Sequence, residues 1–280
     1  MAKRRRQANG LQGRAAAMVR RLGVAMALGI AGISQIPGCS VTPFEAKPGN
    51  PAVAVGERTA VAGDFSACPQ HFPGAVPAIP WPGRQRALCF EAYAVLHSGE
   101  SKTPVYTVER LTRSSVDAAK GVKRVDRFYP EARLPGADRA QLADYAGSGF
   151  DRGHMAPAGD MPTDSAKAQS FSLANMIPQA PELNQRGWSE IEQSTRKYAE
   201  RAPGEVFVFT GPAFAQRPKT IGPGKVWVPS QTWKVVYSRG DRRVWAYWLD
   251  NVGGKQSLKP ISYGEFTQRS GIRLLADAGL

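Results

Sequence analysis

An arginine and a histidine lie two residues apart in the sequence Asp151-Arg152-Gly153-His154. His154 is one of only three histidines in the chain. A neutral imidazole takes a proton from water, and a guanidinium holds an anionic phosphate through several N–H donors. These residue types therefore suit cleavage of a phosphodiester bond. By itself, the tetrapeptide is more often a surface ion pair of Asp151 with Arg152 beside a structural histidine.

Other residues of types that can bind phosphate or a metal ion lie at defined sequence separations from His154. Arg124 opens the run Arg-Val-Asp-Arg-Phe-Tyr-Pro, Asn184 lies thirty residues after His154, and Glu192 follows eight residues later. Taken singly, an asparagine near a helix start is most often a cap, and Glu192 would pair with Arg196 on a helix surface. The order and spacing of the whole set carry more information than any member.

Together these residues resemble the DNA/RNA non-specific endonucleases of the ββα-metal (His-Me finger) superfamily. That family includes sugar-non-specific bacterial nucleases and mitochondrial endonuclease G. The resemblance covers about residues 85–275. It implies an α+β fold, with a central antiparallel sheet, flanking helices and a ββα-metal finger that carries the active site. It also implies metal-dependent hydrolysis of DNA and RNA.

The resemblance implies a role for each residue. His154 would be the general base that activates water, and Asn184 would hold a single Mg²⁺ ion, with Mn²⁺ or another divalent cation as the alternative. An amide oxygen is a suitable ligand for such hard cations. Arg124 and Arg152 would bind the scissile phosphate, and Glu192 would order water molecules around the metal.

Several neighbouring residues leave alternatives open. Arg127 competes with Arg124 as the phosphate ligand, because both lie in the same run. Asp151 is expected to brace the turn, and Asn175 to support the site. Trp188 is expected in the core, with stacking on a base as the less frequent alternative.

The elements that must position these residues follow from the sequence pattern. Residues 88–111 predict a hairpin with a turn at 98–101 that opens the central sheet. Residues 114–147 are polar and rich in Pro and Gly, so we expect mostly loop there. Thr163 and Asp164 predict the start of a short helix that runs to Phe171.

Pro181 predicts the start of a longer helix with Asn184 in its first turn. We expect Glu192 to point back towards Asn184, because helical side chains lean towards the N-terminus. The residues expected to form the core stripe of this helix are Leu183, Gly187, Ile191, Ser194 and Tyr198. Further strands are expected at 206–210, 225–228, 232–238 and 243–249, and a last helix at 261–270 that ends at Gly271.

The beginning of the chain has the composition of an export signal. Residues 1–38 contain seven basic residues and no acidic one, and residues 22–33 are apolar. We therefore predict an export signal over 1–38, a flexible linker over 39–63 and the endonuclease domain over 64–280. The signal carries half of the net charge of +14, and the remaining positive charge favours encounter with polyanions such as DNA and RNA.

The three cysteines support a periplasmic or secreted location. Cys39 follows Ile-Pro-Gly, which resembles a lipoprotein cleavage box, so lipidation of Cys39 with membrane anchoring stands beside ordinary signal cleavage. Cys68 and Cys89 flank a Pro-rich stretch, and a disulfide between them is the simplest interpretation in an exported protein. His71 and His97 are expected to be structural.

Two other functions remain open at this point. The chain could be a non-catalytic module that binds nucleic acid at the cell surface, or its substrate could be another phosphodiester or a narrower set of nucleic acids. A homodimer and an inhibitor protein are further expected partners from the family resemblance.

Overall fold

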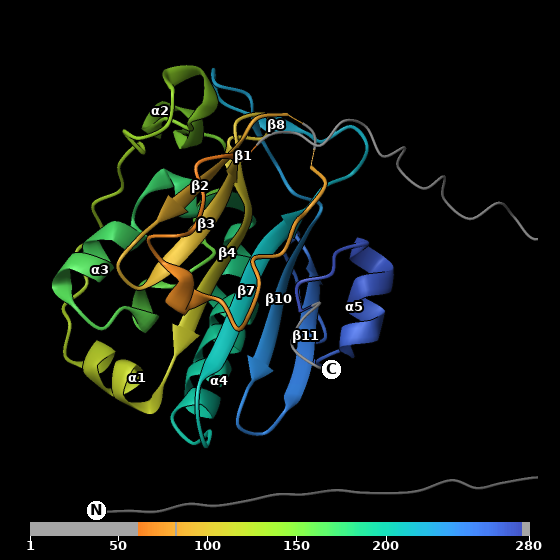
Figure 1. Cartoon of the computed structure of the whole chain (residues 1–280). Helices are drawn as coiled ribbons and strands as arrows, with labels where there is room; N and C mark the ends of the chain where they lie inside the picture. The colour runs from red at the N-terminus through yellow and green to blue at the C-terminus, as the bar shows by residue number, and fades with distance from the viewer. Residues whose placement is uncertain (1–60, 82, 276–280) are drawn as a thin grey trace, which may run out of the picture. The chain divides into compact units, whose positions relative to one another are not determined.

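The computed structural model describes residues 61–81 and 83–275, and a seven-stranded sheet organises them (Figure 1). Its order is β1-β2-β3-β4-β7-β10-β11, and every neighbouring pair is antiparallel except β1 and β2. The strands are β1 (Val61–Ala62), β2 (Gln85–Cys89), β3 (Tyr93–Ser98), β4 (Thr103–Leu111), β7 (Val206–Ala213), β10 (Gln231–Ser238) and β11 (Arg243–Asp250). The predicted central antiparallel sheet is confirmed.

The helices are short and lie around this sheet. They are α1 (Arg113–Lys120), α2 (Leu142–Tyr145), α3 (Asp164–Ser170), α4 (Ser189–Ala199) and α5 (Tyr263–Ser270). Single 3-10 turns lie at Pro69–His71, Gly136–Asp138, Ala158–Asp160 and Leu173–Asn175. A small hairpin, β8 (Thr220–Ile221) with β9 (Val226–Trp227), stands apart from the large sheet.

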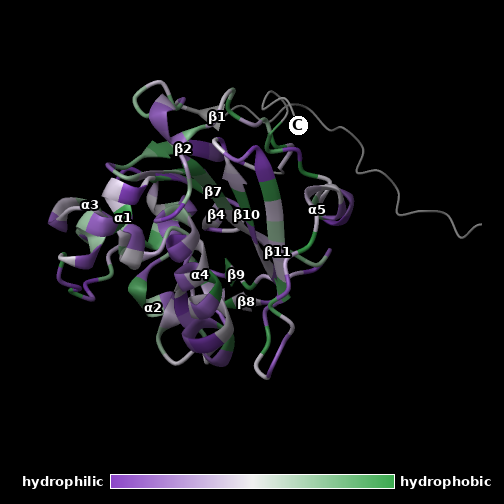
Figure 2. Ribbon diagram, turned by 90° about the horizontal axis from the view of Figure 1, so that it is seen from below, coloured by the Kyte–Doolittle hydropathy of each residue, from purple (hydrophilic) through white to green (hydrophobic). Residues whose placement is uncertain are grey.

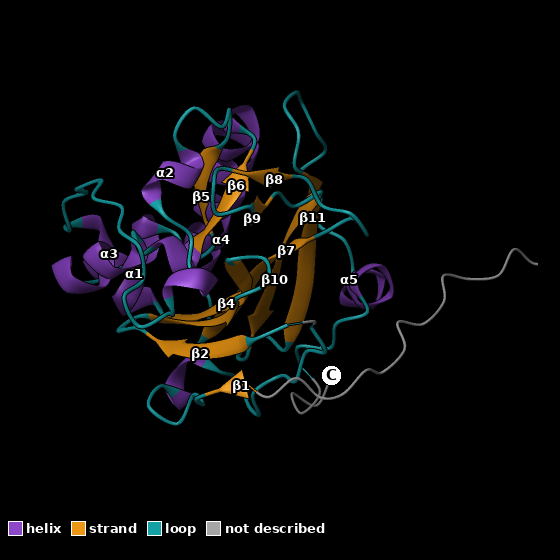
Figure 3. Ribbon diagram, turned by 90° about the horizontal axis from the view of Figure 1, so that it is seen from above, coloured by secondary structure: helices purple, strands orange, loops and turns teal. Residues whose placement is uncertain are grey.

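The two faces of the sheet are covered by different parts of the chain. On one face, Phe209 and Trp233 pack with Phe65 and Phe72 from the segment before β2 and with Phe266 of α5. The opposite face is covered by α1, α3 and α4, and Figure 3 shows β5 and β6 on that same side. Helix α4 turns a largely hydrophilic surface outward (Figure 2). The site is therefore built on one face only.

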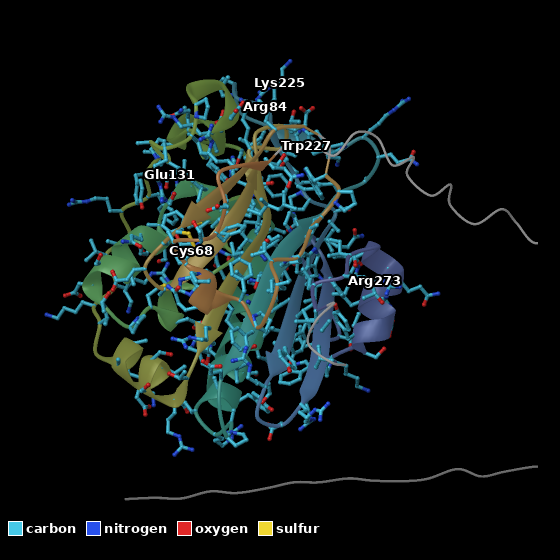
Figure 4. All side chains as sticks on the ribbon, viewed as in Figure 1. Cys68, Arg84, Glu131, Lys225, Trp227 and Arg273 are labelled. Atoms are coloured by element: carbon cyan, nitrogen blue, oxygen red, sulfur yellow. A yellow bond between two sulfur atoms is a disulfide. The ribbon has the colours of Figure 1, made fainter. Side chains whose placement is uncertain are left out.

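A disulfide joins Cys68 to Cys89, as predicted, and it fastens the segment before β2 to the end of that strand (Figure 4). His71 and His97 are both buried, and a ring nitrogen of each lies within hydrogen-bond distance of a backbone carbonyl oxygen. Nε2 of His71 lies 3.2 Å from the oxygen of Phe90, and Nε2 of His97 lies 2.9 Å from the oxygen of Asp138. These contacts confirm that neither histidine is available for chemistry.

Three elements of the second layer form the predicted finger. Strands β5 (Asp151–His154) and β6 (Met176–Gln179) pair antiparallel, and the helix that contains Asn184 and Glu192 follows β6 directly. Between the strands, the Thr163 hydroxyl caps α3 by accepting from the Ala166 amide at 3.0 Å. The sequence correctly predicted this cap.

The helix after β6 differs from the regular helix that we expected. It begins as a π-helical segment, η5 (Leu183–Trp188), before continuing as α4. The buried side chains are Leu183, Trp188, Ile191, Thr195 and Ala199. The prediction was correct for Leu183 and Ile191, whereas the other three buried positions each lie one residue after the predicted Gly187, Ser194 and Tyr198. The wide turn of the π-helical segment, with its i→i+5 hydrogen bonds, accounts for this shift.

Two boundaries also differ from the prediction. Helix α1 lies within the stretch expected to be loop, where Thr112 and Ser115 form a reciprocal capping box and Val116 and Ala119 are buried. At the N-terminal side, Val61–Ala62 fall in the predicted linker but pair with β2 as strand β1. The sheet therefore begins slightly before the predicted domain boundary.

Candidate active site

Strand β5 presents its side chains alternately, so Arg152 and His154 lie on one side and Asp151 on the other. Gly153 separates them and faces the paired strand β6. A Cβ atom at this position would lie 2.1 Å from Oε1 of the buried Gln179. Glycine is therefore required here, and it lets β5 approach β6 closely enough to fix the position of His154.

Two phenylalanine rings surround the imidazole of His154. The Phe171 ring meets it edge to face, with centroids 5.1 Å apart and planes at 87°. The Phe128 ring lies 5.8 Å from it, and the two phenylalanine rings are 5.1 Å from each other. His154 thus stands in an aromatic enclosure formed by one residue of the loop before α2 and one at the end of α3.

This enclosure keeps His154 in its neutral form. The pKa of His154 is lowered to about 3, chiefly by burial and then by the positive charge of Arg124, and the negative charge of Asp126 only partly opposes this. Nε2 is buried and has no hydrogen-bond partner among residues 61–81 and 83–275. A neutral imidazole with an uncommitted nitrogen is able to accept a proton.

Both predicted phosphate-binding arginines lie beside this enclosure. Cζ of Arg152 is 4.4 Å from the centroid of Phe128, and Cζ of Arg124 is 5.4 Å from that of Phe171. Arg124 also pairs with Asp126 at 2.6 Å. The exposed side chain of Arg127 makes no hydrogen bond, ion pair or ring contact within the described part of the chain. The structure thus brings Arg124, rather than Arg127, to His154.

Asn184 is joined to the histidine strand through Asp151. Nδ2 of Asn184 donates to Oδ2 of Asp151 at 2.9 Å, and Nε2 of Gln185 donates to the same oxygen at 2.9 Å. Because the amide nitrogen of Asn184 is engaged, its carbonyl oxygen is the atom left for a ligand. Asp151 thus does more than brace the turn, since it also orients the predicted metal ligand.

The donor set around Asn184 fits a divalent cation that retains most of its water. It consists of an amide oxygen with the Asp151 carboxylate beside it, and both are hard oxygen ligands. Among the described residues, no group of three His, Cys, Asp or Glu side chains is arranged to hold a metal.

Glu192 lies on α4 in a strongly charged environment. The pKa of Glu192 is raised to about 7, chiefly by burial; Lys234 and Arg196 oppose the rise, and Asp160 adds to it. Arg124 also lowers it, which places Glu192 within electrostatic reach of the arginine beside His154. The alternative, a pairing of Glu192 with Arg196 on the helix surface, is not seen, and Arg196 instead pairs with Asp160 at 2.5 Å.

A buried layer of charged residues, which was not predicted from the sequence, lies between α4 and the sheet. Glu109 of β4 and Lys234 of β10 are both nearly fully buried, and Nζ of Lys234 donates to Oγ1 of Thr210 at 2.7 Å. Burial holds the pKa of Glu109 well above its usual range. With Asp160 and Arg196, these groups form what we call the buried ionic layer. An alternating strand pattern does not reveal it, because charged residues in strands are normally exposed.

Two other residues singled out in the sequence, Asn175 and Trp188, are buried and support the fold. Asn175 is fully buried and clamps the finger, since Oδ1 accepts from the Ala156 amide and Nδ2 donates to the oxygens of Ala156 and Ser170. Trp188 is also fully buried, which confirms its place in the core and excludes stacking on a base. Cys39 lies outside the described residues. Within them, no helix is both long enough and apolar enough to cross a membrane.

The fold and this arrangement agree with comparisons to known proteins. A family model for DNA/RNA non-specific endonucleases matches residues 73–275, so the chain belongs to that family. The chain is 36% identical over 166 residues to Nuclease C1 of Cunninghamella echinulata var. echinulata, covering 55% of this chain and 66% of that protein. It is 34% identical over 151 residues to human mitochondrial endonuclease G, covering 54% of this chain and 50% of that protein.

A solved structure has the same fold. The crystal structure of an EndoG/EndoGI complex matches with a TM-score of 0.58 and 24% identity, over 69% of this chain and 86% of that chain. The matched part spans between half and two thirds of the two relatives by sequence. The predicted α+β architecture with its ββα finger is therefore confirmed.

Proposed function

We propose that this chain is a metal-dependent endonuclease that hydrolyses phosphodiester bonds of DNA and RNA, with His154 as general base and Asn184 as metal ligand. Family membership supports the reaction class. The roles assigned to the residues are supported by the arrangement of the finger. It brings a buried neutral histidine, two arginines and the Asn184–Asp151 pair onto adjoining elements.

Each residue has a defined part in the reaction. Nε2 of His154 takes a proton from the attacking water, because it is unprotonated at neutral pH and has no competing partner. Arg124 and Arg152 hold the phosphate oxygens and stabilise the additional negative charge that develops in the transition state. Contacts to phosphate carry no sequence information, so we expect little base preference.

The metal ion would be held by the Asn184 carbonyl oxygen next to the Asp151 carboxylate. When bound, Mg²⁺ or another divalent cation neutralises phosphate charge and stabilises the departing oxygen. Glu192 orders the surrounding water and adds negative charge that favours the cation. Asp151 fixes the orientation of Asn184 through its hydrogen bond.

Export is part of the proposal. The basic and apolar start of the chain and the Cys68–Cys89 disulfide both support a periplasmic or secreted location. Lipidation of Cys39 stays a prediction, as do the homodimer and the inhibitor protein.

The test is digestion of plasmid DNA and of RNA by the mature protein, with Mg²⁺, with Mn²⁺ and with EDTA. We expect metal-dependent cleavage that is lost in His154→Ala and Asn184→Ala. Arg124→Ala should lose far more activity than the matched control Arg127→Ala, because only Arg124 lies beside His154. Salt-dependent binding without cleavage under either metal ion would refute the catalytic proposal and favour a non-catalytic binding module.

A further inference from the structure

Each of the two phenylalanines around His154 also contacts one arginine. Phe128 lies between His154 and Arg152, and Phe171 lies between His154 and Arg124. The three rings and two guanidinium groups therefore form one continuous cluster, which we call the aromatic cluster.

The backbone holds both phenylalanines in place. The amide of Tyr129 donates to the oxygen of Phe171 at 3.2 Å, and the amide of Leu173 donates to the oxygen of Tyr129 at 2.8 Å. A parallel bridge between Tyr129 and Ser172 joins the same two segments. Phe171 is fully buried, whereas Phe128 is half-buried. The two rings are thus anchored by paired backbone and not by their own packing alone.

The ring of Phe128 supports the guanidinium of Arg152. Within the described residues, the side chain of Arg152 makes no hydrogen bond or ion pair, and its Cζ lies 4.4 Å from the ring centroid. A guanidinium held over a ring keeps its N–H donors free. The edge-to-face contact with Phe171 likewise orients the His154 imidazole without using its nitrogens.

We propose that Phe128 and Phe171 are positioning residues, which hold His154, Arg124 and Arg152 through ring contacts and so leave Nε2 of His154 and the N–H groups of Arg152 free for water and substrate. A salt bridge would place Arg152 equally well but would occupy N–H groups that must bind phosphate, as the pairing with Asp126 occupies Nε of Arg124. This proposal rests on the proposed endonuclease function, although its structural part is measurable without activity.

The first measurement is the titration of His154 in the whole mature protein, followed by NMR of labelled imidazoles. Only three histidines are present, and His154→Ala identifies the resonance. Phe171→Leu and Phe128→Leu should each shift the apparent pKa of His154 upwards, towards the ordinary value. Phe90→Leu is the matched control, because Phe90 lies under Arg133 at the same 4.4 Å but has no ring contact with His154.

The second measurement is a double-mutant cycle on DNA cleavage. Phe128→Leu should raise KM about two- to fivefold, the usual contribution of an exposed cation–π contact. Its effect should be less than additive with Arg152→Ala, because both changes disturb the same group. Phe128→Tyr, which retains the ring, should restore KM. Phe171→Leu should instead lower kcat, by up to about 10²-fold if the imidazole is displaced.

The outcomes separate the two proposals. If the parent protein never cleaves nucleic acid, the proposed function fails, and the His154 titration still decides whether the rings position the imidazole. The positioning proposal is overturned if His154 has the same apparent pKa in Phe171→Leu as in Phe90→Leu. It is also overturned if the effects of Phe128→Leu and Arg152→Ala on KM are fully additive. Thermal unfolding of each variant identifies loss of fold, and Phe128→Tyr keeps the proposal testable if Phe171→Leu does not fold.

Discussion

The Asp151 carboxylate accepts a hydrogen bond from the Asn184 side chain over 2.9 Å, although the two residues are 33 positions apart. This bond ties the strand that carries His154 to the helix that carries Asn184. We predict that Asp151→Asn weakens metal activation about 10- to 100-fold, the usual range for residues that orient a metal ligand. The dependence of cleavage rate on Mg²⁺ concentration measures the change.

Gln185 provides the control for this prediction. It donates to the same oxygen of Asp151 at 2.9 Å but is exposed and adjoins no other predicted site residue except Asn184. Gln185→Ala should therefore change the Mg²⁺ requirement little. An unchanged Mg²⁺ requirement in Asp151→Asn would show that Asn184 is oriented without Asp151.

Glu192 should make the stability of the metal-free protein depend on pH. Its pKa is raised to about 7, so the folded protein retains a proton that the unfolded chain releases near pH 4.5. The stabilisation is complete below about pH 4.5 and is lost as the pH rises to about 7. Because the Glu192 side chain is only half-buried and solvent weakens the effect, we expect the free energy of unfolding to change by on the order of 2 kcal/mol. Chemical unfolding in EDTA from pH 4.5 to 7.5 measures it.

Glu192→Gln should flatten this dependence, because glutamine does not titrate. Binding of the metal ion should depend on pH in the opposite direction and strengthen as the pH rises, because a deprotonated Glu192 favours a cation. Binding of Mg²⁺ near pH 7 should thus release protons in the parent protein and fewer in the variant. Equal proton release by both proteins would argue against a role for Glu192 at the metal.

Lys234 should be a strong determinant of stability despite its charge. It is 1% exposed, donates to Thr210, and lies among the carboxyl groups of Glu109, Asp160 and Glu192. Lys234→Met removes one partner of the buried ionic layer, which typically costs about 3–5 kcal/mol. Urea unfolding measures the loss.

Lys120→Met is the comparison for that measurement. Lys120 pairs with Asp117 and Glu200 at the surface, and solvent screens such exposed pairs, so their loss should change stability little. Similar stability of the Lys234→Met and parent proteins would mean that methionine packing offsets the lost charge, and the layer would then have no stabilising role.

The disulfide should contribute a measurable part of the stability. Cys68 is buried in the apolar cluster with Phe65 and Phe72. Replacing both Cys68 and Cys89 by serine should cost about 2–5 kcal/mol. Thermal unfolding of the oxidised and reduced parent protein should show a loss of similar size, whereas reduction should leave the double variant unchanged. A lowered Tm of the double variant under reducing conditions would point to another cause.

Much of the fold was predictable because local signals agreed with it. The β3–β4 hairpin, the Thr163 cap of α3 and Gly271 at the end of α5, which has φ 69°, all follow from turn and cap chemistry. The residues brought together at the finger were also named from the sequence. Their spacing was informative because Asn184 and Glu192 lie on η5 and α4, which directly follow the strand paired with the His154 strand.

Other features depend on contacts that a sequence pattern does not encode. The π-helical turn has no distinctive composition, so the buried stripe shifted from Gly187 to Trp188. Glu109 and Lys234 are charged residues in strands, and only the packing of α4 on the sheet shows that they are buried. The pairing of Phe128 with Phe171 depends on a backbone bridge between segments about forty residues apart.

The position of the disulfide has a consequence for the producing cell. The bond closes only under oxidising conditions, and it fastens the segment that covers the sheet face opposite the finger. Under the proposed export, the chain in the cytoplasm would lack a contribution comparable with a large part of a domain's usual net stability of about 5–15 kcal/mol. Full maturation would then be coupled to leaving the cytoplasm, which would spare the genome and transcripts of the cell that makes the proposed nuclease.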